Sequence, residues 1–84
     1  MEYVLDAECM QTEEEAHKYL RKQLHLPEYY GENLDALYDC LTEMEKTEIY
    51  VLHGDAVKGY GKRVVRVLLA AEKENDELSV QICI

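Results

Sequence analysis

Hydrophobic and polar positions follow two different spacings along the chain, and these spacings predict three strands and three helices. Short stretches of apolar, aromatic and β-branched residues, alternating with polar ones in the last stretch, are typical of strands. Longer stretches whose apolar side chains recur every three or four positions are typical of amphipathic helices. The predicted strands are residues 2–5, 48–53 and 78–84. The predicted helices are residues 13–24, 34–43 and 62–74.

Local signals place the starts of the first two helices. Thr12 followed by Glu15 fits a capping box, in which the threonine accepts a hydrogen bond from the first turn and the glutamate reaches back. A loop that contains Gly31 follows the first helix, and Asn33 is a natural N-cap for the second. Residues 54–61, GDAVKGYG, are expected to form a loop or a single helical turn.

The order strand, helix, helix, strand, helix, strand predicts an α/β domain with a parallel sheet, because helical crossovers join strands that run in the same direction. Right-handed crossovers that advance in one direction place every helix on one face of the sheet. We therefore predict a two-layer fold with strand order 1-2-3 and three to four helices. The 84 residues form a single domain, residues 1–84, which is too small for a large enclosed cavity.

The charge balance limits the classes of partner. The chain has nine lysines and arginines against eighteen aspartates and glutamates, so its net charge is −9 with neutral histidines. Such a surface repels nucleic acids and anionic lipids and attracts cationic molecules. The sequence has no signal-peptide pattern and no stretch of ~20 apolar residues. We therefore expect a cytoplasmic protein that does not bind a membrane.

Neither the cysteines nor the histidines have the spacing of a metal or redox site. The three cysteines form no CxxC pair and are expected to be reduced thiols that pack as small hydrophobic side chains: Cys9, Cys40 and Cys83. Cys40 is not expected to be a nucleophile, since the adjacent Asp39 disfavours its thiolate. The three histidines are predicted to be ordinary surface or loop residues: His17, His25 and His53.

Residues 53–63, HGDAVKGYGKR, resemble a phosphate-binding loop only in part. Gly54 and Gly59 have the required G-x-x-x-x-G spacing, but Tyr60 and Gly61 follow where such a loop has lysine and then serine or threonine. We expect these glycines to allow a tight turn instead.

The second predicted helix has two different faces. At about 100° per residue its leucines cluster on one side, which predicts the face that packs on the core. A separate stripe carries two carboxylates, an aromatic ring and a hydroxyl: Asp35, Tyr38, Asp39 and Thr42. Asp35 lies in the first turn, where the helix dipole stabilises an acid by about 0.3–1 kcal/mol. Asp39 lies beyond that turn, and the like charge four residues away costs about 0.2–0.5 kcal/mol.

Two adjacent tyrosines, Tyr29 and Tyr30, lie in the loop before this helix. We expect one ring to pack inward with a hydrogen-bonded hydroxyl and the other to remain available. With the acidic stripe they predict a surface suited to a basic groove on another protein. The alternative is that both tyrosines serve only the core and the carboxylates form an ordinary solvated face.

Residues 26–43, LPEYYGENLDALYDCLTE, resemble the barstar family, the intracellular proteins that inhibit secreted guanyl-specific ribonucleases such as barnase. Nearly every position of this stretch fits the family. Weaker similarity extends over the preceding helix, the later VVRVLLAAEKE helix and the final strand. The resemblance implies a three-stranded parallel sheet with helices, in which the second helix and the loop before it cover a nuclease active site.

The resemblance also implies which residues bind the partner. Those that match family contact positions, with Tyr38 in place of a tryptophan, are Tyr29, Gly31, Asn33, Asp35, Tyr38, Asp39 and Thr42. Three positions depart from the family pattern. Met44 replaces a second tryptophan, Glu43 replaces a glycine, and Ala70 stands where the family has a contacting glutamate. Glu74, one helical turn further, is the candidate replacement for that glutamate.

We therefore expect a ribonuclease inhibitor that binds one basic secreted enzyme molecule in the cytoplasm, with Asp39 in the place of a substrate phosphate. The alternative is a barstar-like adaptor for a basic protein that is not a ribonuclease. Catalysis is not expected, because a metal site at Asp35 and Asp39, with Glu32 or Glu43, would need further converging ligands and a dry cleft. We expect no cofactor, metal, nucleic acid or small-molecule substrate.

Overall fold

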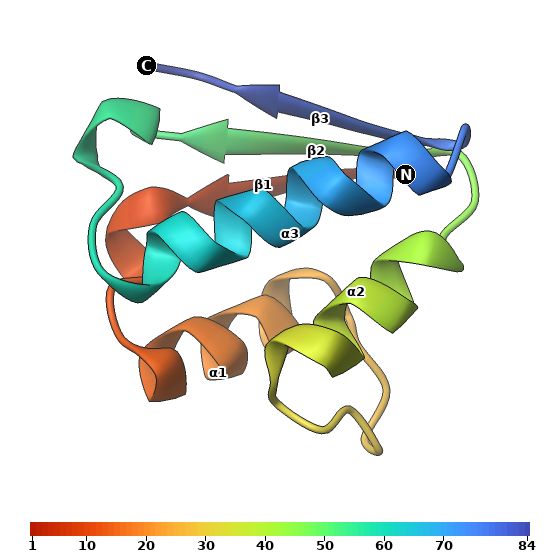
Figure 1. Cartoon of the computed structure of the whole chain (residues 1–84), viewed down its shortest axis with the longest axis horizontal. Helices are drawn as coiled ribbons and strands as arrows, with labels where there is room; N and C mark the ends of the chain where they lie inside the picture. Colours follow the sequence, from red (N-terminus) through yellow and green to blue (C-terminus); the bar gives the residue numbers. More distant parts are fainter.

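The computed structural model describes residues 1–84 as a sheet with helices packed on one of its faces (Figure 1). The strands are β1 Glu2–Asp6, β2 Thr47–Leu52 and β3 Leu78–Ile82. The helices are α1 Glu13–Gln23, α2 Leu34–Thr42 and α3 Tyr60–Glu74, and the two 3₁₀ turns are η1 Ala7–Cys9 and η2 Gly54–Ala56. The predicted α/β fold is confirmed, although α3 begins, and β3 ends, two residues earlier than expected.

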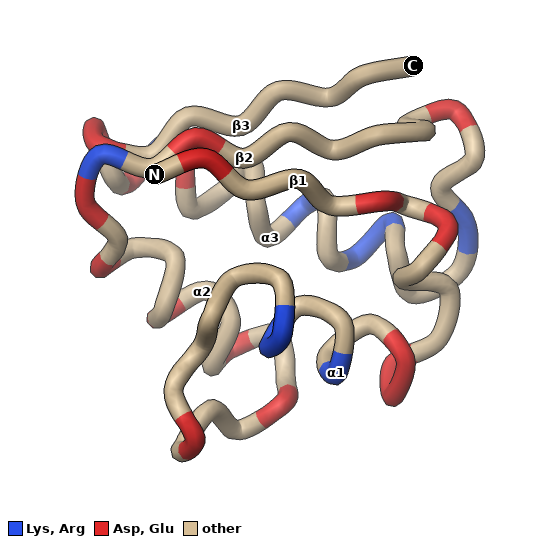
Figure 2. Tube along the Cα trace, turned by 180° about the vertical axis from the view of Figure 1, so that it is seen from behind, with Lys and Arg blue, Asp and Glu red and all other residues tan.

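The sheet has the predicted order β1-β2-β3 and is parallel throughout. Leu5 of β1 pairs with Val51 of β2, and Ile49 of β2 pairs with Val80 of β3. Both crossovers pass through helices on the same side, which leaves the second face of the sheet without a helical cover. Figure 2 views that open face, with the strands in front of α3.

The core lies between the inner face of the sheet and the helices. Sixteen buried hydrophobic residues form one cluster, to which every strand and every α-helix contributes. Burying a leucine of this kind contributes roughly 1.5–3 kcal/mol, so these contacts fix the positions of the helices. The open face of the sheet carries polar side chains such as Glu48 and Gln81 beside the exposed Val4, which is compatible with contact with water.

Both predicted N-caps are present. Thr12 Oγ1 accepts a hydrogen bond from the Glu15 amide at 3.2 Å, and Asn33 Oδ1 accepts one from the Ala36 amide at 2.8 Å. The Glu15 carboxylate accepts from the amide of Gln11 at 3.3 Å instead of from the cap residue itself. The capping box therefore closes one residue earlier than its usual form, and it still ties the chain before α1 to the first turn of α1.

The segment between β2 and α3 is a connection without the features of a phosphate loop. It contains only the turn η2, and Gly59 then adopts φ +54° immediately before α3. A Cβ atom at Gly59 would lie 2.7 Å from the carbonyl oxygen of Gln11, so the backbone needs glycine for space as well as for conformation. The prediction that the glycines allow a tight turn is confirmed at this position.

The three cysteines are free and half-buried. None of the helices combines the length and the apolar composition that a membrane span requires.

Candidate functional site

Helix α2 has the two faces that its sequence predicts. Leu37 and Leu41 are completely buried in the core, whereas Asp35 and Asp39 are exposed. Tyr38 is half-buried and packs against the core. The structure therefore presents the two carboxylates and this ring on the outer side of the helix.

The carboxylates of Asp35 and Asp39 form no ion pair within the chain, whose salt bridges all lie elsewhere. Residues 28–45 contain six acidic side chains and no lysine or arginine. Figure 2 shows acidic positions along this loop and α2, while basic positions lie mainly on α1, on α3 and in the loop before α3. The negative charge of this surface is thus not neutralised by the protein itself.

The loop before α2 is held by short local contacts. Asn33 caps the helix through Oδ1 and donates from Nδ2 to the carbonyl of Gly31 at 3.2 Å. A Cβ atom at Gly31 would lie 3.0 Å from Asn33 Nδ2, so any larger residue there would press on the side chain that caps α2. At the other end of the helix, the Thr42 hydroxyl donates to the Asp39 carbonyl at 3.0 Å. Gly31, Asn33 and Thr42 therefore shape the backbone around the two aspartates.

The two adjacent tyrosines divide as expected, with one ring inside and one outside. Tyr30 is buried, and 87% of Tyr29 is exposed. The Tyr30 hydroxyl hydrogen-bonds to Nδ1 of His17, and Nε2 of His17 hydrogen-bonds to the Tyr60 hydroxyl at 2.6 Å. A neutral imidazole donates from one nitrogen and accepts at the other, so it can satisfy both hydroxyls. The loop before α2 is thereby fastened to α1 and to the start of α3.

The prediction that His17 is a surface or loop residue is wrong, since only 1% of it is exposed. His17 follows Ala16 and precedes Leu20 on the buried face of α1, so helical spacing could have indicated its burial. Burial lowers the pKa of His17 below its usual 6.5, while Glu13 and Glu32 act in the opposite direction. His25 and His53 are exposed, as expected.

Two further contacts that the sequence did not suggest hold the site in place. Asn75, which follows α3, donates from Nδ2 to the carbonyls of Leu41 at 3.0 Å and Met44 at 2.8 Å. The Leu41 carbonyl lies in the last turn of α2 and also accepts from the Met44 amide at 3.3 Å, and Met44 follows the helix, so Asn75 ties the end of α2 to the end of α3. Arg21 Nη2 donates to the Glu28 carbonyl at 2.8 Å and fastens the loop to α1. Asn75 lies in the polar stretch after α3, where no sequence pattern predicts its hydrogen bonds to the end of α2.

A hollow of about 300 Å³ lies between the tyrosine loop and α2. It brings together Tyr29, Gly31 and Asp39 of the predicted partner-binding set, and its full lining is Tyr29, Tyr30, Gly31, Ala36, Asp39, Cys40 and Glu43. A second hollow of about 250 Å³ shares Tyr29 and Glu43 and is lined mainly by apolar residues. The exposed ring of Tyr29 thus lines both hollows, of which the first carries two carboxylates and the second is mainly apolar. Such a combination is suited to contact with a cationic protein surface.

Comparison with known proteins assigns the family. A family model described as "Barstar (barnase inhibitor)" matches residues 1–84. The chain belongs to the barstar family. It is also 31% identical over 86 residues to a Bacillus subtilis (strain 168) protein named "Putative ribonuclease inhibitor YrdF", with 94% of each chain covered. The family resemblance seen in residues 26–43 is therefore confirmed over the whole chain.

Cys40 lies beside Asp39 in the same hollow and is not arranged as a nucleophile. Burial raises the pKa of its thiol, and the carboxylates of Glu43 and Asp39 raise it further. The thiolate that a nucleophile requires is therefore scarce. The half-buried side chain packs against the core instead.

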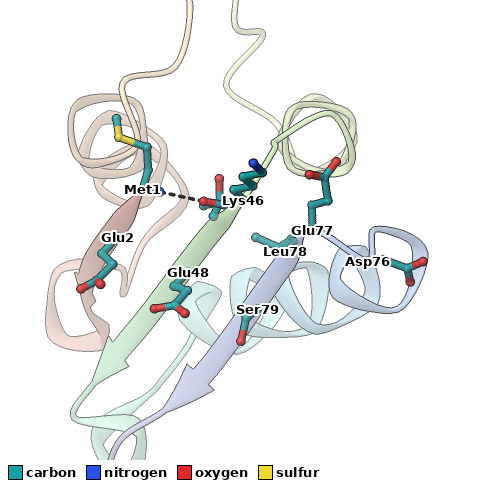
Figure 3. Close-up of a pocket in the computed structure, with 9 residues that line it drawn as sticks. Met1, Glu2, Lys46, Glu48, Asp76, Glu77, Leu78 and Ser79 are labelled. Atoms are coloured by element: carbon teal, nitrogen blue, oxygen red, sulfur yellow. Dashed lines mark hydrogen bonds between the residues drawn. The ribbon is translucent and has the colours of Figure 1, made fainter.

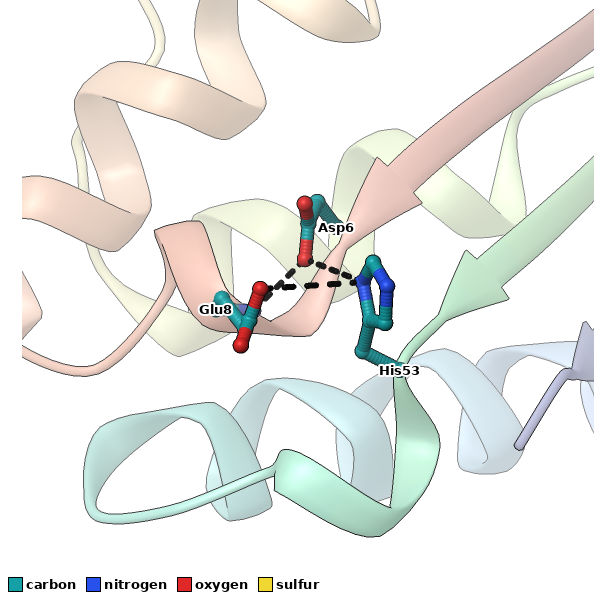
Figure 4. Close-up of side chains that lie close together, drawn as sticks. All are labelled: Asp6, Glu8 and His53. Carbon is teal, nitrogen blue, oxygen red and sulfur yellow. Dashed lines mark hydrogen bonds and ion pairs between the residues drawn. The ribbon is translucent and has the colours of Figure 1, made fainter.

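A histidine and two carboxylates meet at the other end of the molecule, where β1 and β2 end (Figure 4). His53 Nδ1 lies 3.0 Å from Asp6 Oδ1 and 3.8 Å from Glu8 Oε1. Asp6 Oδ1 also accepts from the Glu8 amide at 2.9 Å and so caps η1. The backbone hydrogen bond from Glu8 and the bond to His53 lower the pKa of Asp6, and Asp6 in turn raises the pKa of His53. The cluster ties the ends of two strands together.

The largest hollow, of about 500 Å³, lies where the strands begin (Figure 3). Four carboxylates surround it, and the Met1 amino group donates to the Lys46 carbonyl at 2.7 Å. None of the predicted partner-binding residues lines this hollow.

Proposed function

We propose that this barstar-family protein inhibits a basic, secreted, guanyl-specific ribonuclease in the cytoplasm, as a 1:1 complex in which α2 and the loop before it cover the enzyme's active site. The observation that carries the proposal is the Asp39 carboxylate. It is exposed, has no cationic partner in the chain, and lines a hollow beside the exposed ring of Tyr29.

The chemistry of a ribonuclease active site explains why a carboxylate would bind there. Such a site holds the phosphate of RNA with arginine, lysine and histidine, so it is already arranged to accept an anion through charge-assisted hydrogen bonds. Asp39 takes the place of that phosphate. Asp35, one helical turn earlier, pairs with a neighbouring basic group, and Tyr29 and Tyr38 cover the rim and exclude water.

The anchoring of the loop supports tight binding. Asn33 and Gly31 hold the start of α2, Asn75 holds its end, and the buried Tyr30 holds the loop to α1. A surface that is already ordered loses less conformational entropy when it binds. The net charge of −9 also favours rapid encounter with a basic enzyme.

An RNA-cleavage assay tests the proposal. Barnase and related basic ribonucleases are each assayed alone and with one equivalent of this protein. We expect stoichiometric loss of cleavage for at least one of them, because the active site would be occluded. Undiminished cleavage by every enzyme of the panel, with excess inhibitor present, would contradict the proposed function.

An adaptor for a basic protein other than a ribonuclease is the second candidate. The departures from the family pattern favour it: Ala70 is exposed on α3 without any charge, and Met44 packs against the core where the family has a tryptophan. Affinity capture from the native cytosol distinguishes the two candidates, since an adaptor would retain a basic protein without ribonuclease activity.

A further inference from the structure

Glu43 stands at a position that is unfavourable for the helix that carries it. It is the C-cap of α2, where free carbonyls already give the helix end a partial negative charge. It also follows Asp39 by four residues, so two like charges lie one turn apart on one face. No cationic side chain of the protein forms an ion pair with either carboxylate. The fold therefore gives no reason for an acid at this position.

Glu43 and Asp39 line the same hollow of about 300 Å³, together with Tyr29. Both carboxylates also act on the thiol of Cys40, which lies between them in the sequence and lines the same hollow. Glu43 extends the lining into the neighbouring apolar hollow, which Tyr29 shares. The depression next to the proposed phosphate surrogate thus carries two negative charges and one exposed aromatic ring.

The spacing of the two carboxylates matches a feature of nucleic acids. Residues four positions apart in a helix are separated by about 6 Å along the axis, which is on the scale of consecutive phosphates in an RNA strand. A ribonuclease binds a polymer, so its groove offers cationic side chains to more than one phosphate. An aromatic ring beside the charges offers a flat face of the kind on which bases stack in single-stranded nucleic-acid sites.

We propose that Glu43 occupies a second phosphate-binding subsite of the partner ribonuclease, adjacent to the subsite that Asp39 fills. This inference rests on the proposed function. Asp39, Glu43 and Tyr29 together imitate a dinucleotide segment of RNA. Glu43 then determines specificity, because an enzyme without an arginine or lysine at the second subsite would bury the Glu43 carboxylate without a partner.

A matched pair of variants tests the role of Glu43. Glu43→Gln and Glu45→Gln each remove one negative charge from an exposed position, but Glu45 lines neither hollow beside Tyr29. The partner is whichever ribonuclease the protein inhibits most strongly in the cleavage assay. We expect Glu43→Gln to weaken binding at least about tenfold, mainly through faster dissociation, and Glu45→Gln to change it less than about threefold.

A double-mutant cycle sharpens the test. When the enzyme's second-subsite arginine or lysine is replaced by alanine, the advantage of the wild-type inhibitor over its Glu43→Gln variant should disappear or reverse, because the Glu43 carboxylate then has no cationic partner. An advantage of the wild type that survives this replacement would place Glu43 elsewhere in the interface and overturn the inference.

The affinities of the variants separate failure of the inference from failure of the proposed function. Equal affinities of Glu43→Gln and Glu45→Gln, or tighter binding by Glu43→Gln, would overturn the inference. If Asp39→Ala weakens binding while Glu43→Gln does not, only the second subsite is wrong. If neither change matters, the proposed binding mode, with Asp39 in the enzyme's active site, also fails, whereas the inhibitory function itself fails only if the cleavage assay finds no inhibited enzyme.

Discussion

Tyr29 and Tyr30 are neighbours in the sequence, yet they lie in two different surroundings. The polar groups near Tyr30 are paired with one another, whereas the charges near Tyr29 are not neutralised within the chain. Around Tyr30, each polar group has a partner: its hydroxyl bonds to His17, and His17 bonds to Tyr60. The structure contains no buried side-chain nitrogen or oxygen without a hydrogen-bond partner. Around Tyr29, the carboxylates of Asp39 and Glu43 line an open hollow and have no cationic partner.

The contrast indicates which region serves the fold and which serves a partner. A protein of this size has little stability to spare, so unpaired like charges on one helix are not explained by folding. The buried hydrogen bonds around Tyr30 hold the loop before α2 in place, and that loop exposes the ring of Tyr29 beside Asp39. Changes to the first region should therefore affect stability, and changes to the second should affect binding.

The largest expected effect is on binding. Asp39→Ala should weaken the complex with the target ribonuclease by about 2–5 kcal/mol, because several enzyme cations would be left buried without a partner. That range describes buried charge pairs at interfaces in general, and the barnase–barstar interface is among the systems behind it. Glu13→Ala on α1 removes the same charge and is the control. Calorimetric titration that gives equal losses for the two variants would contradict the account.

The next effect is on stability and separates the two tyrosines. Tyr30→Phe should lower the free energy of unfolding by about 1–3 kcal/mol, because it leaves a nitrogen of the buried His17 without its partner. Tyr29→Phe should change it by less than about 0.5 kcal/mol, since its ring is exposed. Urea denaturation measures both. Similar losses for the two variants would show that the distinction between the regions is wrong.

The pH dependence of stability below pH 6.5 tests the buried His17. Because burial lowers the pKa of His17 below 6.5 in the folded protein, acid protonates the unfolded chain first. The contribution of His17 to stability is complete above pH 6.5 and is lost as the pH falls from 6.5 through the lowered pKa, by at most about 1.4 kcal/mol per pH unit for one proton.

His53 acts with the opposite sign. Its hydrogen bond to Asp6 raises its folded pKa above 6.5, so its contribution is complete below 6.5 and is lost as the pH rises through the raised value. His53→Asn, which tolerates the residue's φ of +59°, should therefore abolish the gain in stability that accompanies a fall in pH from the raised pKa to 6.5, and should leave the loss below pH 6.5 unchanged. Urea denaturation above and below pH 6.5 checks both signs, and a variant that keeps the gain above pH 6.5 would contradict the assignment.

The smallest effect concerns encounter with the partner. The association rate should fall by up to about tenfold between about 0.01 M and 0.5 M salt, because the attraction between opposite charges is screened. Stopped-flow mixing measures the rate directly. An association rate that is independent of salt would remove the steering role of the net charge of −9.

The sheet order and the two faces of α2 could be predicted because they depend on local spacing and on the direction of crossovers. The caps at Thr12 and Asn33 could be predicted for the same reason, since their partners lie three residues away. The hydrogen bonds of His17 could not, because its partners lie 13 and 43 residues away in the chain. Periodicity alone does not identify such partners.

The candidate site was predictable only as a list of residues. The stretch 26–43 identified the family, and the helical period grouped Asp35 with Asp39. The hollow that joins Asp39 to Tyr29 depends on how the loop folds back over α2, and the bonds from Asn75 depend on the packing of α3 beside α2. These features come from tertiary contacts that no local pattern encodes.

A structure of the complex with the inhibited ribonuclease tests the central claim most directly. The measured quantity is the distance from the Asp39 carboxylate oxygens to the enzyme's arginine, lysine and histidine nitrogens. The account predicts at least two of these nitrogens at about 2.7–2.9 Å, with water excluded by Tyr29. A complex in which Asp39 faces solvent, or in which α2 lies away from the catalytic groove, would contradict it.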